Sequence, residues 1–119
     1  MSLCILAGGK LTVILANLFT LSWTHSVEQV EWQETWRASP AGVEIVEARV
    51  QGSGAGMEPP PGSRYERGWW TYRPDVGLLP ELRLAASGAT QSAWTLCAAG
   101  TCHALGGRPG STIVVSYCP

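Results

Sequence analysis

Three titratable side chains fall among tryptophans in the first third of this 119-residue chain, and they are the residues best suited to chemistry. His25 follows an alternating segment on its apolar side, and histidine exchanges protons near neutral pH. Glu34 falls on the tryptophan-bearing face of the next segment, where a carboxylate is costly unless it is paired or protonated. We expect His25 and Glu34 to form a buried polar pair, either purely structural or shaping a small pocket.

The predicted ligand-binding site is therefore polar and aromatic. It consists of His25, Glu28, Glu34, Trp23, Trp32 and Trp36. Three uses remain open at this point. The first is a non-enzymatic domain that binds a small ligand, and the second is a small enzyme that uses His25 and Glu34 as acid and base. The third is a protein-interaction module, for which a large exposed apolar patch would be the sign.

Other reactive patterns are weaker. Ser26 and His25 are adjacent, so their side chains point to opposite faces of an extended strand and make a poor nucleophile–base pair. A metal held by His25, Glu28 and Glu34 has no characteristic spacing. The glycine-rich segment 52–56 is followed by prolines rather than by a helix, which a phosphate loop requires. We predict no catalytic residue, no metal site and no cofactor.

Composition limits the class of protein. The formal net charge is −1 and no basic stripe is present, which disfavours nucleic-acid binding. The length fits one domain, residues 1–119. The apolar run 11–21 is too short to cross a bilayer, and no cleavage pattern follows it, so we predict neither a transmembrane segment nor a signal peptide.

Four cysteines permit two disulfides. If Ala99-Gly100 is a two-residue turn, Cys97 and Cys102 face each other at a non-hydrogen-bonded pair, a spacing that a disulfide accepts. Free buried thiols are the alternative. Cys4 and Cys118 would meet only if the first and last strands are neighbours.

Period-two alternation and turn residues dominate the rest of the chain, and no helical periodicity appears. The predicted strands are 3–7, 11–15, 18–24, 30–38, 43–50, 69–73, 81–86, 94–97, 102–105 and 111–117. Between 52 and 62, glycines and prolines predict one long loop. The fold is all-β, a small antiparallel sandwich or barrel of about nine or ten short strands, and the pattern does not choose between the two.

Several motifs resemble the DUF1850 domain family, a bacterial family of unknown function. These motifs are Phe19-Thr20-Leu21 with Trp23-Thr24-His25-Ser26-Val27-Glu28, Trp32-Gln33-Glu34-Thr35-Trp36, Gly52-Ser53-Gly54-Ala55-Gly56-Met57, Gly68-Trp69-Trp70, and Leu96-Cys97 through Cys102. Family members are often encoded beside, or fused to, TRAP-type transporters of the TAXI subclass. The resemblance therefore implies an accessory role in solute uptake, with a transporter component or its small solute as partner and the periplasm as the compartment. It supplies no catalytic residues.

Overall fold

The computed structural model describes residues 2–24, 30–52, 61–86 and 93–119, and these residues form an all-β domain. Eleven strands are present: β1 (Ser2–Ala7), β2 (Lys10–Ile14), β3 (Leu18–Thr24), β4 (Glu31–Ser39), β5 (Gly42–Gln51), β6 (Arg64–Glu66), β7 (Trp69–Tyr72), β8 (Leu82–Leu84), β9 (Trp94–Ala98), β10 (Thr101–Leu105) and β11 (Ile113–Cys118). No helix in this described part of the chain is long and apolar enough to cross a membrane.

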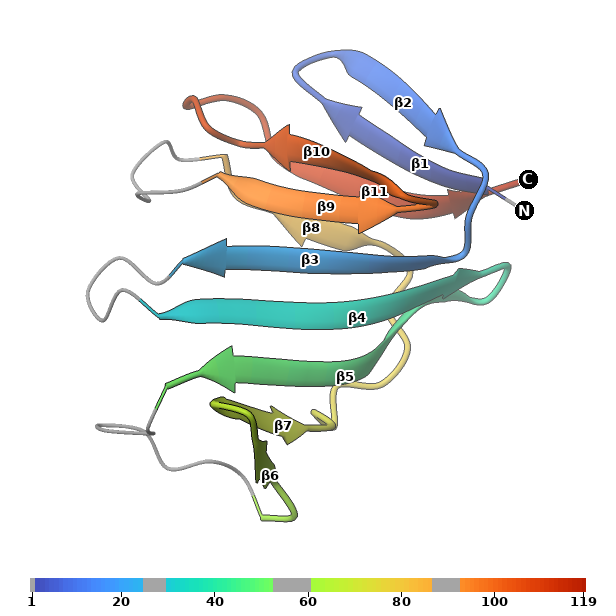
Figure 1. The fold of residues 1–119 in the computed structure, drawn as a ribbon. Helices are drawn as coiled ribbons and strands as arrows, with labels where there is room; N and C mark the ends of the chain where they lie inside the picture. The colour runs from blue at the N-terminus through green and yellow to red at the C-terminus, as the bar shows by residue number, and fades with distance from the viewer. Residues whose placement is uncertain (1, 25–29, 53–60, 87–92) are drawn as a thin grey trace.

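The strands form two antiparallel sheets that pack face to face (Figure 1). The larger sheet has the order β10-β9-β3-β4-β5-β7-β6, and the smaller has the order β2-β1-β11-β8. The sheets are not closed into a barrel. The all-β prediction is confirmed, and the structure resolves its open choice in favour of a sandwich-like arrangement.

Alternation along the strands builds the core between the two sheets. From the larger sheet, Phe19, Leu21 and Leu96 are almost completely buried. From the smaller sheet, Leu3 and Val115 face them and are fully buried. The inner faces of both sheets are therefore the apolar faces that the sequence predicts.

Tight hairpins fix the register of neighbouring strands. Gly8 and Gly9 both have positive φ, as do Ala99 and Gly100, so each hairpin closes through a two-residue turn. The second of these turns places Cys97 opposite Cys102, as predicted.

Ten of the eleven strands correspond to predicted segments, and β6 is the addition. All three of its residues are exposed, so it has no alternation of buried and exposed positions to reveal it. It pairs with β7 through a short turn and forms the edge of the larger sheet.

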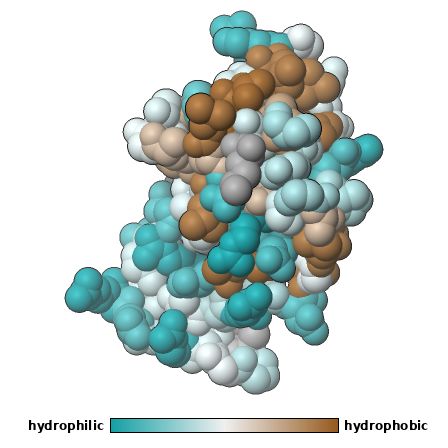
Figure 2. All heavy atoms as spheres, turned by 90° about the vertical axis from the view of Figure 1, so that its right-hand side faces the viewer, coloured by the Kyte–Doolittle hydropathy of each residue, from teal (hydrophilic) through white to brown (hydrophobic). Residues whose placement is uncertain are grey.

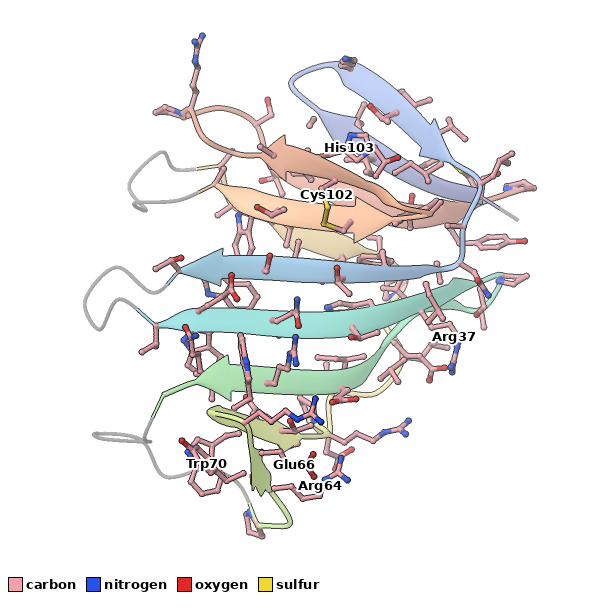
Figure 3. All side chains as sticks on the ribbon, in the orientation of Figure 1. Arg37, Arg64, Glu66, Trp70, Cys102 and His103 are labelled. Carbon is pink, nitrogen blue, oxygen red and sulfur yellow. A yellow bond between two sulfur atoms is a disulfide. The ribbon has the colours of Figure 1, made fainter. Side chains whose placement is uncertain are left out.

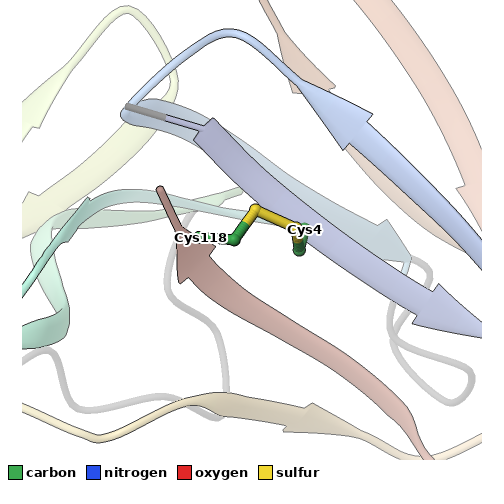
Figure 4. The surroundings of a disulfide bond; sticks show 2 residues. All are labelled: Cys4 and Cys118. Atoms are coloured by element: carbon green, nitrogen blue, oxygen red, sulfur yellow. A yellow bond between two sulfur atoms is a disulfide. The ribbon is translucent and has the colours of Figure 1, made fainter.

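Two disulfides join parts of the chain that the strand pairings bring together. Cys97 and Cys102 are bonded across the β9–β10 hairpin, with Cα atoms 4.0 Å apart. Because β1 pairs with β11, Cys4 and Cys118 also meet, with Cα atoms 5.8 Å apart (Figure 4). No free thiol remains, and disulfides are typical of proteins from oxidising compartments.

Candidate functional site

Four tryptophans line up across the inner face of the larger sheet. This tryptophan row crosses five neighbouring strands and consists of Trp94, Trp23, Trp32, Val50 and Trp70. It lies at the end of the sheet where β3 ends and β4 begins, the end at which Trp70 is labelled in Figure 3. A strand end of this kind holds side chains on a rigid support.

The rings of the row are packed against one another. Trp23 and Trp32 lie nearly parallel, with ring centroids 6.2 Å apart and planes inclined by 9°. Trp94 is tilted against Trp23, with centroids 4.9 Å apart. At the far end, Trp70 contacts Tyr65 of β6 with centroids 4.9 Å apart. These contacts restrain the rings and give the row a defined shape.

The indole N–H groups of the row differ in how they are satisfied. The N–H of Trp94 donates to the carbonyl oxygen of Ala85 at 3.0 Å. In contrast, Nε1 of Trp32 and Nε1 of Trp70 are buried, and neither has an acceptor in the described structure. A buried donor without a partner costs free energy, so it calls for an explanation such as a bound water or ligand.

Glu34 lies beside the row, two residues along β4 from Trp32, on the same inner face. Its cross-strand neighbours are Leu21 and Ala48, both buried. The N–H of Trp36 donates to its Oε1 at 3.0 Å. Burial raises the pKa of Glu34 above its ordinary value, and the hydrogen bond from Trp36 offsets part of that increase.

Tyr72 of β7 completes the polar part of this face. It pairs across β5 with Ala48, whose small side chain separates it from Glu34. Burial raises the pKa of Tyr72, and the negative charge of Glu34 raises it further. The face thus holds a carboxyl group, a phenol and two unpaired indole donors within a few strands.

The structure brings together four of the six predicted site residues. Trp23, Trp32 and Glu34 share the inner face, and Trp36 lies with them but is 4% exposed and belongs to the core. His25 and Glu28 lie outside the described residues, so their pairing with Glu34 stays a prediction.

Sequence reasoning missed three aromatic members of this face, Trp94, Trp70 and Tyr72. Each stands in a predicted strand, yet the place of Trp94 depends on the pairing of β9 with β3, and the place of the other two depends on the pairing of β7 with β5. The only signal within the sequence was the alternation inside the predicted strands 94–97 and 69–73.

A second surface has a different character. Four aliphatic side chains are exposed on the outer side of β1 and β2 and just after β2. Their exposed fractions lie between 46% and 81%, and they are Leu6, Leu11, Val13 and Leu15. Hydrophobic atoms gather at the top of the molecule in Figure 2, where β1 and β2 lie. This is the type of patch expected of a protein-interaction module.

Comparison with known proteins assigns the chain to a family. A family model described as a domain of unknown function, DUF1850, matches residues 19–105, which is well over half of the chain. The chain belongs to the DUF1850 family. No curated protein and no solved structure matches it.

The matched part of this DUF1850 domain corresponds mainly to the larger sheet. Residues 19–105 contain nearly all of the larger sheet together with β8, whereas β1, β2 and β11 lie outside the match. The tryptophan row and Glu34 are therefore within the family region. Among the described residues of the domain, no three His, Cys, Asp or Glu side chains cluster to hold a metal ion.

Proposed function

We propose that the chain is a non-enzymatic domain that binds a small solute and acts as an accessory to a TAXI-type TRAP transporter. Its binding surface would be the tryptophan row with Glu34, extended by His25 and Glu28 as the sequence predicts. Trp36 holds the Glu34 carboxyl in place rather than contacting the solute.

The observation that carries the proposal is the pair of buried indole N–H groups of Trp32 and Trp70. Each is a hydrogen-bond donor for which the described residues supply no acceptor. A small solute with carbonyl or hydroxyl oxygens would provide acceptors, while the faces of the rings would cover its apolar part. Binding sites commonly combine aromatic walls with a few polar groups in this way.

Two further observations support the accessory role. The family resemblance links such domains to TAXI-type transporters, and the two disulfides favour an oxidising compartment such as the periplasm. A TRAP-type uptake system would meet its accessory domain in the periplasm, so the two disulfides and the proposed partner point to the same compartment.

A thermal-shift screen with sugars, amino acids, small carboxylates and divalent metals tests the proposal. A ligand at one hundred times its dissociation constant stabilises the folded state by about 2.7 kcal/mol, which is readily measured. We expect at least one compound to raise the melting temperature of the wild type. We expect a smaller increase in Trp32→Phe, Trp70→Phe and Glu34→Gln.

Trp94→Phe is the matched control, because it removes an indole N–H that already has an acceptor, Ala85. Without ligand both Trp94→Phe and Trp32→Phe lose packing of the indole ring, and Trp94→Phe should melt at a lower temperature than Trp32→Phe because it also removes a hydrogen bond that the fold makes. With ligand, the shift should fall less in Trp94→Phe than in Trp32→Phe or Trp70→Phe, because the N–H of Trp94 is already bonded to Ala85 and is not available to the solute. Equal ligand shifts in all variants, or no active compound in the panel, would contradict the proposal.

A further inference from the structure

A groove lies on the opposite, outer face of the larger sheet, over β5, β7 and β6. It encloses about 410 Å³ and is lined by three arginines, Arg49, Arg64 and Arg67, and by Glu47, Glu66, Trp69 and Thr71. A smaller hollow of about 250 Å³ adjoins it and shares Glu47, Arg64 and Thr71. We call the larger of the two the arginine groove.

Strand register sets two of the guanidinium groups on either side of a hydroxyl. Thr71 of β7 is opposite Arg49 of β5 and also opposite Arg64 of β6. The three side chains therefore stand side by side on one face. Both positive charges thus flank the same hydroxyl, with no other strand between either arginine and Thr71.

Arg49 is held in a fixed orientation without an ion pair to a carboxylate. Its Nε–H donates to Oε1 of Gln33 on β4, and its guanidinium carbon lies 4.3 Å from the centroid of the Trp69 ring. Both contacts are with neutral groups, which leaves the two terminal NH₂ groups of the guanidinium for a ligand. A guanidinium oriented in advance loses less entropy when it binds an oxyanion.

Two arginines elsewhere on the described surface are paired with glutamates, whereas those of the groove are not. Arg37 pairs with Glu44, and Arg83 with Glu81. In the part of the chain that the structure describes, no carboxylate oxygen lies within 4.0 Å of the three groove arginines. In Figure 3 the labelled Arg64 and Glu66 project from the β6–β7 end of the sheet, away from Trp70.

The β6–β7 turn adds a third positive charge, Arg67, at a position whose backbone conformation favours Asn. Arg67 has φ of 52° and is followed by Gly68, also with positive φ. Asn is the residue that such turns prefer at the first position, because it tolerates left-handed backbone well. Arginine at this position places a further positive charge beside the groove.

We propose that the arginine groove binds the carboxylate of a small organic acid. Arg49 and Arg64 hold its two oxygens, and the Thr71 hydroxyl donates a third hydrogen bond. Three arginines and two glutamates leave one net positive charge, which matches a single carboxylate. The same glutamates repel a phosphate dianion and offer partners for an amine on the ligand.

This site is independent of the proposed function, since it lies on the other face of the sheet. Its test is an NMR titration of the uniformly ¹⁵N-labelled protein, following the Trp69 indole and the Arg49 Nε–H at low chloride. Acetate, glycine and inorganic phosphate are the probes. We expect saturable shifts with acetate and glycine at lower concentrations than with phosphate.

Variants of opposite expected effect keep the test informative. Arg64→Gln and Arg49→Lys should weaken acetate binding about tenfold or more, because each removes charge-assisted hydrogen bonds. Glu66→Gln should strengthen it, because a like charge is removed. Arg83→Gln, on the other sheet and 71% exposed, is the control and should leave binding unchanged.

Three results would overturn the proposal. They are no saturable shift with either carboxylate probe, tighter binding of phosphate than of acetate, and an equal effect of Arg64→Gln and Arg83→Gln.

Discussion

Glu34 shows how a single residue can be tolerated on an apolar face. It stands between Leu21 and Ala48 on the inner side of the larger sheet, and the indole of Trp36 is its hydrogen-bond donor. One such bond does not replace the hydration of a carboxylate, so burial keeps the pKa raised. The protonation state of Glu34 must then be linked to folding.

The sign of this linkage gives a prediction for Glu34→Gln. Below the ordinary pKa of 4.5, Glu34 is protonated in both the folded and the unfolded chain. As the pH rises towards the higher pKa of the folded state, the unfolded chain releases its proton first, and the free energy of unfolding of the wild type falls. The advantage of Glu34→Gln over the wild type should therefore increase from about pH 4 to about pH 7, by less than about 1.4 kcal/mol per unit of pKa shift, because Glu34 is partly solvated.

Urea unfolding at several pH values measures this difference. Glu31→Gln is the control, since Glu31 lies on the same strand but is exposed on the outer face. If the two variants followed the same pH profile, burial of Glu34 would not be the cause.

Among the structural elements, the β4–β5 hairpin has an unusual neighbour. Val43 and Leu79 exchange two backbone hydrogen bonds, of 2.7 and 2.8 Å, so the segment that leads from β7 to β8 is fastened to the start of β5. Gly42 makes this approach possible. A Cβ built there would lie 2.2 Å from the carbonyl oxygen of Leu79, and its φ is 138°.

Gly42→Ala should consequently destabilise the domain by roughly 1–3 kcal/mol, through backbone strain and displacement of Leu79. Gly107→Ala is the matched control, because its backbone has no positive φ and the nearest atom to a new Cβ is 3.6 Å away. Chemical unfolding compares the two. If Gly42→Ala were no more destabilised than Gly107→Ala, the segment around Leu79 would be able to move away from Val43 at little cost in free energy.

The elements also show how far sequence reasoning reaches. Alternation is a local property, so it correctly placed Glu34 on the tryptophan face and identified ten strands. The choice of neighbouring strands, in contrast, is not a local property of the sequence. The position of Trp70 beside Val50, and of Arg49 beside Thr71 and Arg64, depends on register between strands separated by loops, which no pattern within one strand encodes. Half of the candidate site and all of the arginine groove arise in this way.

At the scale of the whole molecule, the two disulfides constrain very different lengths of chain. Cys97 and Cys102 are five residues apart and bind β10, an edge strand, to β9. Cys4 and Cys118 are 114 residues apart and join the first strand to the last. The second bond lies outside the family-matched residues 19–105 and closes the chain around them.

This difference predicts unequal costs of removing the two bonds. If a disulfide acts mainly by limiting the freedom of the unfolded chain, the double variant Cys4→Ser/Cys118→Ser should lose about 5 kcal/mol and Cys97→Ser/Cys102→Ser about 2 kcal/mol. Equilibrium unfolding in urea, with the wild type oxidised, measures both losses. Both disulfides join neighbouring antiparallel strands, and the length of chain that each one closes is the main difference between them. An equal loss, or a greater loss for the hairpin pair, would mean that the Cys97–Cys102 bond stabilises the folded edge of the sheet rather than restricting the unfolded chain.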